Sequence, residues 1–361
     1  MKIIHCADLH LDSNMTSNLP ADKARERRAE LLSTFGRMIG FAEENSVDAI
    51  IIAGDLFDKK NISRTAKNIV YDAVTKHPGI VFYYLRGNHD ADGFLSSFEE
   101  IPANLKLFGD EWTAYETGKI TITGAEMTGG HRRLCGSLSL DPYKFNIVVL
   151  HGQETENRSS DSPESIDLRE LRGRGIDYLA LGHIHAYKDA RLDSRGRYCY
   201  PGCLEGRGFD ECGDHGFVLL DIDEEKNTYS ADFIPFARRR LYEIKADISG
   251  CMTTPEIMGR VRAAITDCES EAMVKLVLTG NVDVNCEKDP GQIEKELEDE
   301  FYFIKTEDKT SPIVSYEDYA ADISLKGEFV RTVQSQSDIS DEEKASIIRY
   351  GIQLLEGKEV Q

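Results

Sequence analysis

The sequence predicts an α/β protein whose first half begins as a parallel, doubly wound sheet. Three short runs of β-branched and aromatic residues, at 2–6, 48–53 and 80–85, alternate with two helical stretches. Strands that alternate with helices pair in parallel, and open parallel sheets bind ligands at the carboxyl ends of their strands. A chain of 361 residues also exceeds the usual size of a single hydrophobic core, so we expect more than one domain.

The first five elements follow from apolar periodicity and from helix boundary signals. Continuous apolar runs are typical of buried strands, whereas the helices show apolar residues at helical spacing and are bounded by Pro20 and by Pro78-Gly79. In order, we expect a strand at 2–6, a helix at 20–45, a strand at 48–53, a helix at 63–77 and a strand at 80–85.

The rest of the first domain is predicted to consist mainly of strands. Shorter, alternating runs from 105 to 123 are typical of antiparallel strands, and buried strands at 145–150 and 177–181 are each followed by histidine. Further strand-like runs are at 187–192, 197–200, 216–222 and 228–235. We place this catalytic domain at residues 1–237.

The composition becomes more acidic after Arg238-Arg239-Arg240. Residues 1–240 carry a net charge of −8, whereas 241–361 carry −13. We expect an α+β domain at 238–320, which the family resemblance described below implies to be a capping domain (the cap), and a C-terminal helical tail at 321–361. Within them we expect strands at 241–248 and 272–279, helices at 255–268 and 290–301, a third strand, and tail helices at 324–335 and 340–356, the last with a Ser340-Glu343 capping box. The tail binds a partner or packs on the cap, and both readings stay open.

Composition limits the classes of function. The net charge of −21 argues against broad, non-specific adhesion to nucleic acid or anionic membrane. No run approaches the ~20 apolar residues of a membrane span and no signal peptide is evident, so we expect a cytoplasmic protein without membrane association. The eight cysteines contain no Cys-x-x-Cys pair and are expected to be free thiols. A zinc cluster of Cys199, Cys203, Cys212 and His215 is the less regular alternative.

The strand-end loops carry the residues from which we predict a metal centre. They are Asp8, His10, Asp55, Asn88, His151, His183 and His185. Two divalent cations about 3.5–4 Å apart need a bridging carboxylate with nitrogen and oxygen ligands on both sides, and such a pair clamps the attacking and leaving oxygens of a phosphoryl displacement. We expect Asp55 to be the bridge. One metal would take Asp8, His10 and His185, and the other Asn88, His151 and His183.

The chemistry of these side chains also indicates the metal. Carboxylate, amide and imidazole ligands without a thiolate favour two Mn²⁺ ions, with Fe or Zn as substitutes. Each fragment alone has a structural alternative, because Asp-x-His often occurs by chance and a lone histidine after a strand is commonly a packed residue. Five of only nine histidines lie at strand ends, however, and this joint pattern favours the metal site.

The same residues carry a resemblance to a known family. Asp8-Leu-His10, Gly54-Asp55, Gly87-Asn88-His89-Asp90, His151-Gly152 and Gly182-His183-Ile-His185 resemble, in order and spacing, the metal motifs of calcineurin-like metallophosphoesterases over about residues 1–186. The resemblance implies a metallophosphoesterase sandwich of two β-sheets flanked by helices, with a dinuclear site at their edge. It implies two catalytic residues besides the ligands: His89 would contact the scissile phosphate and help the leaving group depart, and Asp58 would orient His89.

Within that superfamily the chain is similar to the SbcD-type DNA repair nucleases. The opening residues 1–12, the loop 54–58 and Tyr200-Pro-Gly202 followed by Phe209 carry this similarity. It implies a Mn²⁺-dependent DNA repair exonuclease that acts on DNA ends with an SMC-like coiled-coil ATPase partner of the SbcC type. The chain has no Gly-x-x-x-x-Gly-Lys-Ser/Thr loop of its own. The alternative is a phosphodiesterase or phosphatase that acts on a small nucleotide or phosphoprotein, and a homodimer is left open.

DNA binding by so acidic a chain requires a local basic rim. The candidates are Lys59, Lys60, Arg64, Arg86, Arg132, Arg133, Arg207 and the 238–240 cluster, each with solvated surface as its alternative. The chain also departs from its relatives here. Lys59-Lys60 stands where protein phosphatases have Arg-Gly, and Asp58 stands where archaeal and eukaryotic nucleases carry histidine.

Overall fold

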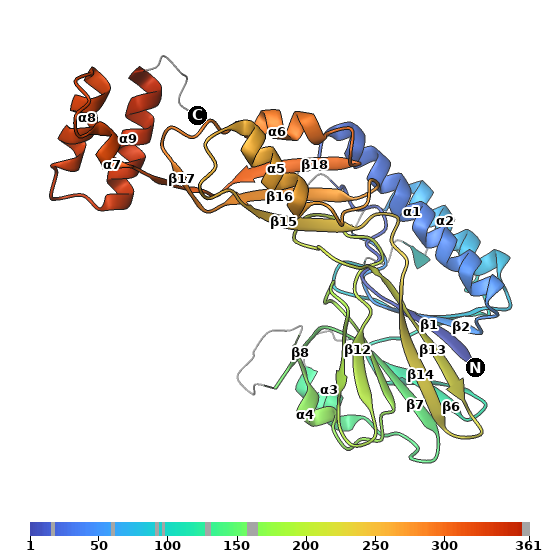
Figure 1. The fold of residues 1–361 in the computed structure, drawn as a ribbon. Coiled ribbons are helices and arrows are strands. Elements are labelled where there is room, and N and C mark those ends of the chain that lie inside the picture. Colours follow the sequence, from blue (N-terminus) through green and yellow to red (C-terminus); the bar gives the residue numbers. More distant parts are fainter. Residues whose placement is uncertain are drawn as a thin grey trace. The chain divides into compact units, whose positions relative to one another are not determined.

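The computed structural model describes the chain as two compact units, Met1–Arg240 and Leu241–Gln361 (Figure 1). It describes all residues except 16–18, 59–61, 91–93, 96–97, 127–130, 157–164 and 356–361, and it leaves out the side chains of 131–133 and 353. The predicted cap and the predicted tail therefore fall in one compact unit. The division into three functional domains stays a prediction.

The first sheet of the N-terminal unit confirms the predicted parallel start, but the prediction that it is doubly wound is wrong, because both connecting helices pack on its outer face and the second sheet covers the other face. Its order is β14-β13-β1-β2-β3-β4, in which β1 to β4 are parallel and β13 and β14 are antiparallel additions. The strands are β1 (Lys2–Cys6), β2 (Ala49–Ala53), β3 (Val81–Leu85), β4 (Leu105–Leu107), β13 (Gly216–Asp223) and β14 (Thr228–Pro235). The connecting helices are α1 (Ala21–Glu44) and α2 (Arg64–Lys76), and the Ser63 hydroxyl caps α2 by accepting a hydrogen bond from the Ala66 N–H.

The second sheet has the order β11-β12-β10-β7-β6-β5, with a parallel centre and antiparallel outer strands. Its strands are β5 (Thr113–Thr117), β6 (Ile120–Gly124), β7 (Phe145–His151), β10 (Tyr178–Gly182), β11 (Lys188–Arg191) and β12 (Arg197–Tyr200). Smaller elements beside it are α3 (His131–Ser137), α4 (Leu168–Leu171) and the pair β8 (Gln153–Thr155) and β9 (Ser165–Asp167). The antiparallel prediction for 105–123 holds for β5 and β6 but is wrong for β4, which pairs in parallel with β3 in the other sheet.

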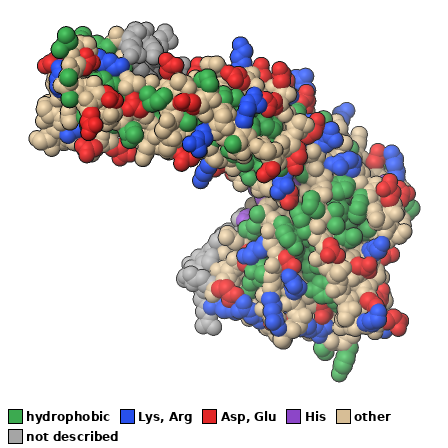
Figure 2. Space-filling view, viewed as in Figure 1, with side chains coloured by type: hydrophobic (Ala, Val, Ile, Leu, Met, Phe, Trp, Pro, Cys, Tyr) green, Lys and Arg blue, Asp and Glu red, His purple; other side chains and the backbone are tan. Residues whose placement is uncertain are grey.

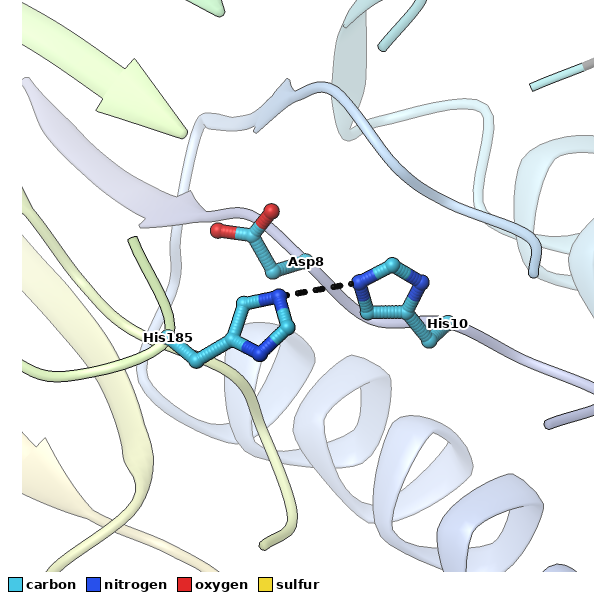
Figure 3. Close-up of side chains that lie close together, drawn as sticks. All are labelled: Asp8, His10 and His185. Atoms are coloured by element: carbon cyan, nitrogen blue, oxygen red, sulfur yellow. Dashed lines mark hydrogen bonds between the residues drawn. The ribbon is translucent and has the colours of Figure 1, made fainter. Parts of the chain in front are cut away.

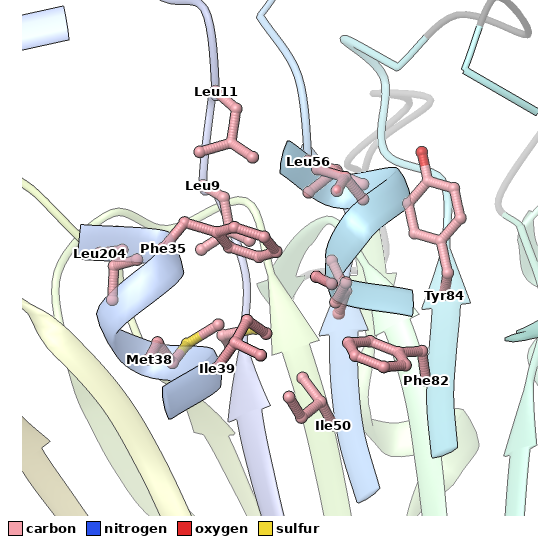
Figure 4. Close-up of a cluster of buried hydrophobic side chains, with 14 of the residues drawn as sticks. Leu9, Leu11, Phe35, Met38, Ile39, Ile50, Leu56, Phe82, Tyr84 and Leu204 are labelled. Carbon is pink, nitrogen blue, oxygen red and sulfur yellow. The ribbon is translucent and has the colours of Figure 1, made fainter. Parts of the chain in front are cut away.

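Three apolar layers hold this unit together. One lies between the two sheets and includes Ile51 of β2 and Ile147 of β7. A second lies outside the first sheet, where Phe35 and Met38 of α1 pack over Ile50 (Figure 4). The third covers the outer face of the second sheet under α3 and α4. Since the central strands are buried on both faces, they appear in the sequence as continuous apolar runs rather than as alternating ones.

The C-terminal unit contains a parallel three-stranded sheet with the order β15-β16-β18. The strands are β15 (Leu241–Asp247), β16 (Met273–Thr279) and β18 (Phe303–Asp308), and they share an apolar core with α5 (Thr254–Ala264) and α6 (Pro290–Leu297). This matches the predicted order of strands and helices.

The tail helices pack against a second pair of short parallel strands. These elements are β17 (Asn281–Asp283), β19 (Ser311–Ile313), α7 (Tyr316–Tyr319), α8 (Leu325–Gln334) and α9 (Asp341–Leu355). Val330 of α8 and Ile348 of α9 form a core with Val284, which directly follows β17. The predicted capping box is present, because Ser340 Oγ accepts from the Glu343 N–H and the Glu343 carboxylate accepts from the Ser340 N–H at 2.9 Å.

Neither a membrane span nor a cysteine-rich zinc cluster is found in the described parts of the chain. None of their helices has both the length and the apolar composition that a span requires. The eight cysteines are free thiols. Cys203 lies 3.2 Å from His215, but no cysteine belongs to a cluster of metal-binding side chains among the described residues.

Candidate metal centre

The predicted ligands lie in loops with unusual backbone conformations. Asp8, His10, Asp55 and His183 have positive φ angles of 50°, 42°, 52° and 105°. Residues other than glycine rarely adopt positive φ angles. Such backbone strain is concentrated where the surrounding structure holds a functional group in place. The loops at the strand ends therefore orient these four side chains, and the unfavourable backbone conformation costs free energy.

Glycines in the motifs make room for the ligands. A Cβ atom at Gly54 would lie 2.1 Å from Nδ1 of His151, and one at Gly87 would lie 2.1 Å from Oδ1 of Asp55. A Cβ at Gly182 would meet the Ala53 carbonyl oxygen at 1.9 Å. Larger residues at these three positions would displace the ligands, which explains why Gly precedes Asp55, Asn88 and His183.

The first predicted ligand group is brought together by β1 and the loop after β10. Asp8, His10 and His185 each offer a ligand atom, and these atoms lie within 4.8 Å of one another. Figure 3 shows the His10 and His185 rings meeting beside the Asp8 carboxylate, with 3.2 Å between their Nε2 atoms. Asp8 and His10 are almost completely buried, so a cation here would be held in a water-poor site.

The second predicted group lies around His151. Its Nε2 atom is 3.0 Å from Oδ1 of Asn88, while its Nδ1 atom is 2.9 Å from the carbonyl oxygen of Ala53. A carbonyl oxygen only accepts hydrogen bonds, so Nδ1 carries the proton and Nε2 is left to face the site. The centre of the His183 ring lies 5.4 Å from that of the His151 ring, and the backbone N–H of His183 donates a hydrogen bond to the Asp8 carboxylate.

Asp55 lies between the two groups. Its Oδ2 atom is 3.8 Å from His10 Nε2 and 3.4 Å from His151 Nε2. Its Oδ1 atom accepts a hydrogen bond from the backbone N–H of His89 at 2.9 Å. This is the position that a bridging carboxylate requires. The structure thus brings together Asp8, His10, Asp55, Asn88, His151 and His185, while His183 is placed beside them only by the contact of its ring with that of His151. The roles of all seven as ligands stay a prediction.

Burial and charge act strongly on the acidic members of the site. Burial raises the pKa of Asp8. Burial also acts to raise the pKa of Asp55, but the contact with His151 outweighs it and lowers that pKa to about 2. Burial would lower the pKa of His151, yet Asp55 raises it to about 9. Buried carboxylates that lie beside imidazoles fit a site that holds divalent cations, because metal binding requires carboxylate and imidazole ligands without their protons.

The two residues predicted to be catalytic lie at the edge of this cluster. The His89 side chain is 47% exposed, whereas those of His10 and His151 are 2% and 4% exposed, so His89 is free to meet a substrate. Asp58 is closer to His10 than to His89: its Oδ1 atom lies 3.2 Å from His10 Nδ1 and 3.7 Å from His89 Nδ1. The prediction that Asp58 orients His89 therefore stays open.

The comparison with protein families decides the classification. Residues 1–187 match the family model described as calcineurin-like phosphoesterase. The chain belongs to this family. Membership and the Asp/His cluster together support its assignment as a metal-dependent phosphoesterase, a hydrolase.

Curated relatives match part of this chain. The uncharacterized metallophosphoesterase YhaO of Bacillus subtilis is 28% identical over 242 residues, 63% of this chain and 59% of that protein. The DNA double-strand break repair protein Mre11 of Sulfurisphaera tokodaii is 29% identical over 204 residues, 53% of this chain and 51% of that protein. This chain thus spans about half to three fifths of the length of these relatives. Among solved structures, TT1561 of Thermus thermophilus has a TM-score of 0.41 and 12% identity, covering 64% of this chain and 98% of that one.

Two further carboxylates support the site of this calcineurin-like phosphoesterase, and of these only Glu211 is not expected from the sequence. Asp90 accepts backbone hydrogen bonds from Leu56, Phe57 and Gly87 and so joins the loops after β2 and β3. Glu211 accepts a hydrogen bond from His185 Nδ1 at 2.6 Å. Burial raises the pKa of Glu211, but His185 and Arg207 outweigh burial and hold it well below its usual value. The motif spacing gives no signal for Glu211, whereas Asp90 is the last residue of the motif Gly87-Asn88-His89-Asp90.

Four arginines of the predicted basic rim pair with carboxylates in the structure. Carboxylates neutralise several of its arginines: Arg86 pairs with Glu126, Arg207 with Glu211, Arg239 with Glu30 and Arg240 with Asp214. Lys59, Lys60 and the side chains of Arg132 and Arg133 lie outside the described residues. On the face seen in Figure 2, the described Lys and Arg side chains are interspersed with Asp and Glu. These four arginines therefore do not form a continuous phosphate-binding surface.

Proposed function

We propose that this chain is a Mn²⁺-dependent phosphodiesterase that acts on DNA ends, as a DNA repair exonuclease of the SbcD type. The observation that carries the proposal is the position of Asp55 between two ligand groups, with an exposed His89 beside it. The names of the Mre11 relatives support DNA as the substrate. Carboxylate, amide and imidazole ligands support manganese.

The residues divide the work of hydrolysis between binding and proton transfer. Asp8, His10, Asp55, Asn88, His151, His183 and His185 would hold the two ions. When bound, such ions lower the pKa of water and stabilise the attacking and leaving oxygens. His89 contributes an imidazole at the open side of the cluster, where it donates a hydrogen bond or a proton to the departing oxygen. The buried Asp8 and His10 keep bulk water away from the opposite side.

A small nucleotide or a phosphoprotein is the second candidate substrate. The paired arginines favour it, because DNA affinity depends on Lys and Arg that are free to neutralise phosphates. DNA binding by the chain alone is then weak.

A substrate panel separates these candidates. Metal-stripped protein is supplied with Mn²⁺ and given end-labelled linear duplex DNA, closed circular DNA, cyclic nucleotides and a phosphomonoester. We expect shortening of linear DNA from its ends, loss of activity with a chelator and recovery on adding Mn²⁺. Rapid hydrolysis of a small nucleotide without cleavage of linear DNA would contradict the exonuclease proposal, and full activity of metal-stripped protein would contradict the metal centre.

The partner is proposed to be a coiled-coil ATPase that binds α9. One face of α9 is buried through Ile348 and Ile352, whereas Ile347, Tyr350 and Leu354 are exposed at a spacing that places them on one stripe. Such a stripe suits a coiled-coil helix. Affinity purification of the full chain from its native cells should recover this ATPase, and a Leu354→Glu chain should lose it. Recovery that is equal for both chains would remove α9 as the binding element.

A further inference from the structure

His10 and His185 are supported in the same way on the side that faces away from the predicted metal. His185 Nδ1 lies 2.6 Å from Oε1 of Glu211, and His10 Nδ1 lies 3.2 Å from Oδ1 of Asp58. The His10 contact is the looser one, because it lacks the alignment of a good hydrogen bond. A carboxylate at Nδ1 fixes the proton there and leaves Nε2 free for a cation. The two Nε2 atoms face each other at 3.2 Å.

Arg207 reaches both supporting carboxylates. Its Nη1 atom lies 3.6 Å from Oδ1 of Asp58, and its Nη2 atom lies 2.9 Å from Oε1 of Glu211. Its backbone N–H also donates to Oε2 of Glu211 at 2.7 Å. Nη2 is 3.0 Å from His185 Nδ1 as well, but the shorter contact with Glu211 requires the proton on that nitrogen, since an ionised carboxylate only accepts.

We propose that Arg207 is a positioning residue that clamps Asp58 and Glu211 in the places from which they orient His10 and His185. This inference rests on the metal centre of the proposed function and assigns it a support that the family motifs do not contain. A planar guanidinium suits the role, because its fork can hold two carboxylates in a fixed geometry, whereas an ammonium acts as a point charge.

The loop that carries Arg207 is itself anchored to α1. The neighbouring Glu205 is buried and pairs with Arg27 Nη2 at 3.0 Å, and it accepts a hydrogen bond from the Thr34 hydroxyl at 2.7 Å. Arg27 Nη2 also donates to the Gly206 carbonyl oxygen at 2.9 Å. Removing one partner of a buried pair is costly, so this network holds the loop in one place. The clamp therefore acts from a fixed base.

The clamp and a purely electrostatic role predict opposite results for Arg207→Ala. If Arg207 acted only through its charge, its removal would strengthen Mn²⁺ binding, because the Coulomb repulsion between the guanidinium and the cation would be lost. Loss of the clamp would weaken it, by about the 10–100-fold that follows removal of a supporting partner of a metal ligand. The sign of the change in affinity thus decides between the two roles.

The test measures Mn²⁺ affinity of the full chain by competition with a chelating dye, independently of activity. We expect Arg207→Ala to bind Mn²⁺ about 10–100-fold more weakly. Arg207→Lys should lose less Mn²⁺ affinity, and it replaces Arg207→Ala in the test if the alanine variant does not fold. Glu211→Gln, which keeps an acceptor for His185, should lose less than Glu211→Ala.

The control is Arg195→Ala. Arg195 forms a comparable two-point pair with Asp177, which precedes β10, whereas His183 and His185 follow that strand. The Mn²⁺ affinity of the Arg195→Ala chain should equal that of the wild type.

The outcomes separate the clamp from the metal centre. A wild-type chain that binds no Mn²⁺ would contradict the proposed function. A wild-type chain that binds Mn²⁺ together with Arg207 variants that bind it equally well or more tightly would overturn the clamp alone.

Discussion

Replacement of Asp55 by alanine is expected to abolish hydrolysis, because both ligand groups lose the carboxylate between them. Oδ2 of Asp55 is 3.8 Å from His10 Nε2 and 3.4 Å from His151 Nε2. Loss of a direct ligand should weaken metal binding by more than the about 10–100-fold typical of a supporting partner. The measurement is metal content per chain together with the hydrolysis rate at several Mn²⁺ concentrations.

The matched control for Asp55→Ala is Asp232→Ala on β14, an exposed position away from the cluster. It should retain both metal and activity. An Asp55→Ala chain that bound as much metal as the wild type and still hydrolysed the substrate would show that Asp55 is not the bridge. The melting temperature of the metal-free chains should be compared, because Asp55 also accepts a hydrogen bond from the His89 N–H.

His89→Ala should have the opposite signature, with metal kept and the rate lost. The imidazole lies at the exposed side of the site, so its removal takes away a proton donor rather than a buried ligand. We expect the rate at saturating substrate to fall by about 10²–10⁴-fold, the usual contribution of a general acid or base. Metal analysis and kinetics on the same samples check both halves of the prediction.

The structure also offers a competing role for His89. Together with His10 and Asp58 it forms a third group whose ligand atoms lie within 4.8 Å of one another. A His89→Ala chain that lost one metal would assign His89 to that group and contradict its role as a non-ligand. His77→Ala, at the C-terminal end of α2, is the control for a histidine outside the site and should change neither quantity.

Much of this architecture could be predicted because its signals are local in the sequence. Buried parallel strands appear as apolar runs, and a ligand that directly follows such a run must lie at the sheet edge. This logic placed Asp8, Asp55 and His151 correctly at one site. It failed for β4 and did not find β17, because segments of three residues are too short to show periodicity.

The support of the site could not be predicted, since it depends on contacts between residues far apart in the chain. Glu211 and His185, which form a hydrogen bond, are 26 residues apart in the sequence. Arg27 and Glu205, which also form a hydrogen bond, are 178 residues apart. The pairing of arginines in the predicted basic rim could not be predicted for the same reason. Arg239 is charged in the sequence, but in the fold it pairs with Glu30, 209 residues away. A sequence shows which residues carry charge and does not show which charges are neutralised.

The most direct test of the metal centre is a crystal structure of the full chain soaked with Mn²⁺, with anomalous scattering recorded to locate the ions. The account predicts two peaks about 3.5–4 Å apart, with the Asp55 carboxylate between them and His10 and His151 on opposite sides. A single peak, or two ions that Asp55 does not bridge, would contradict it.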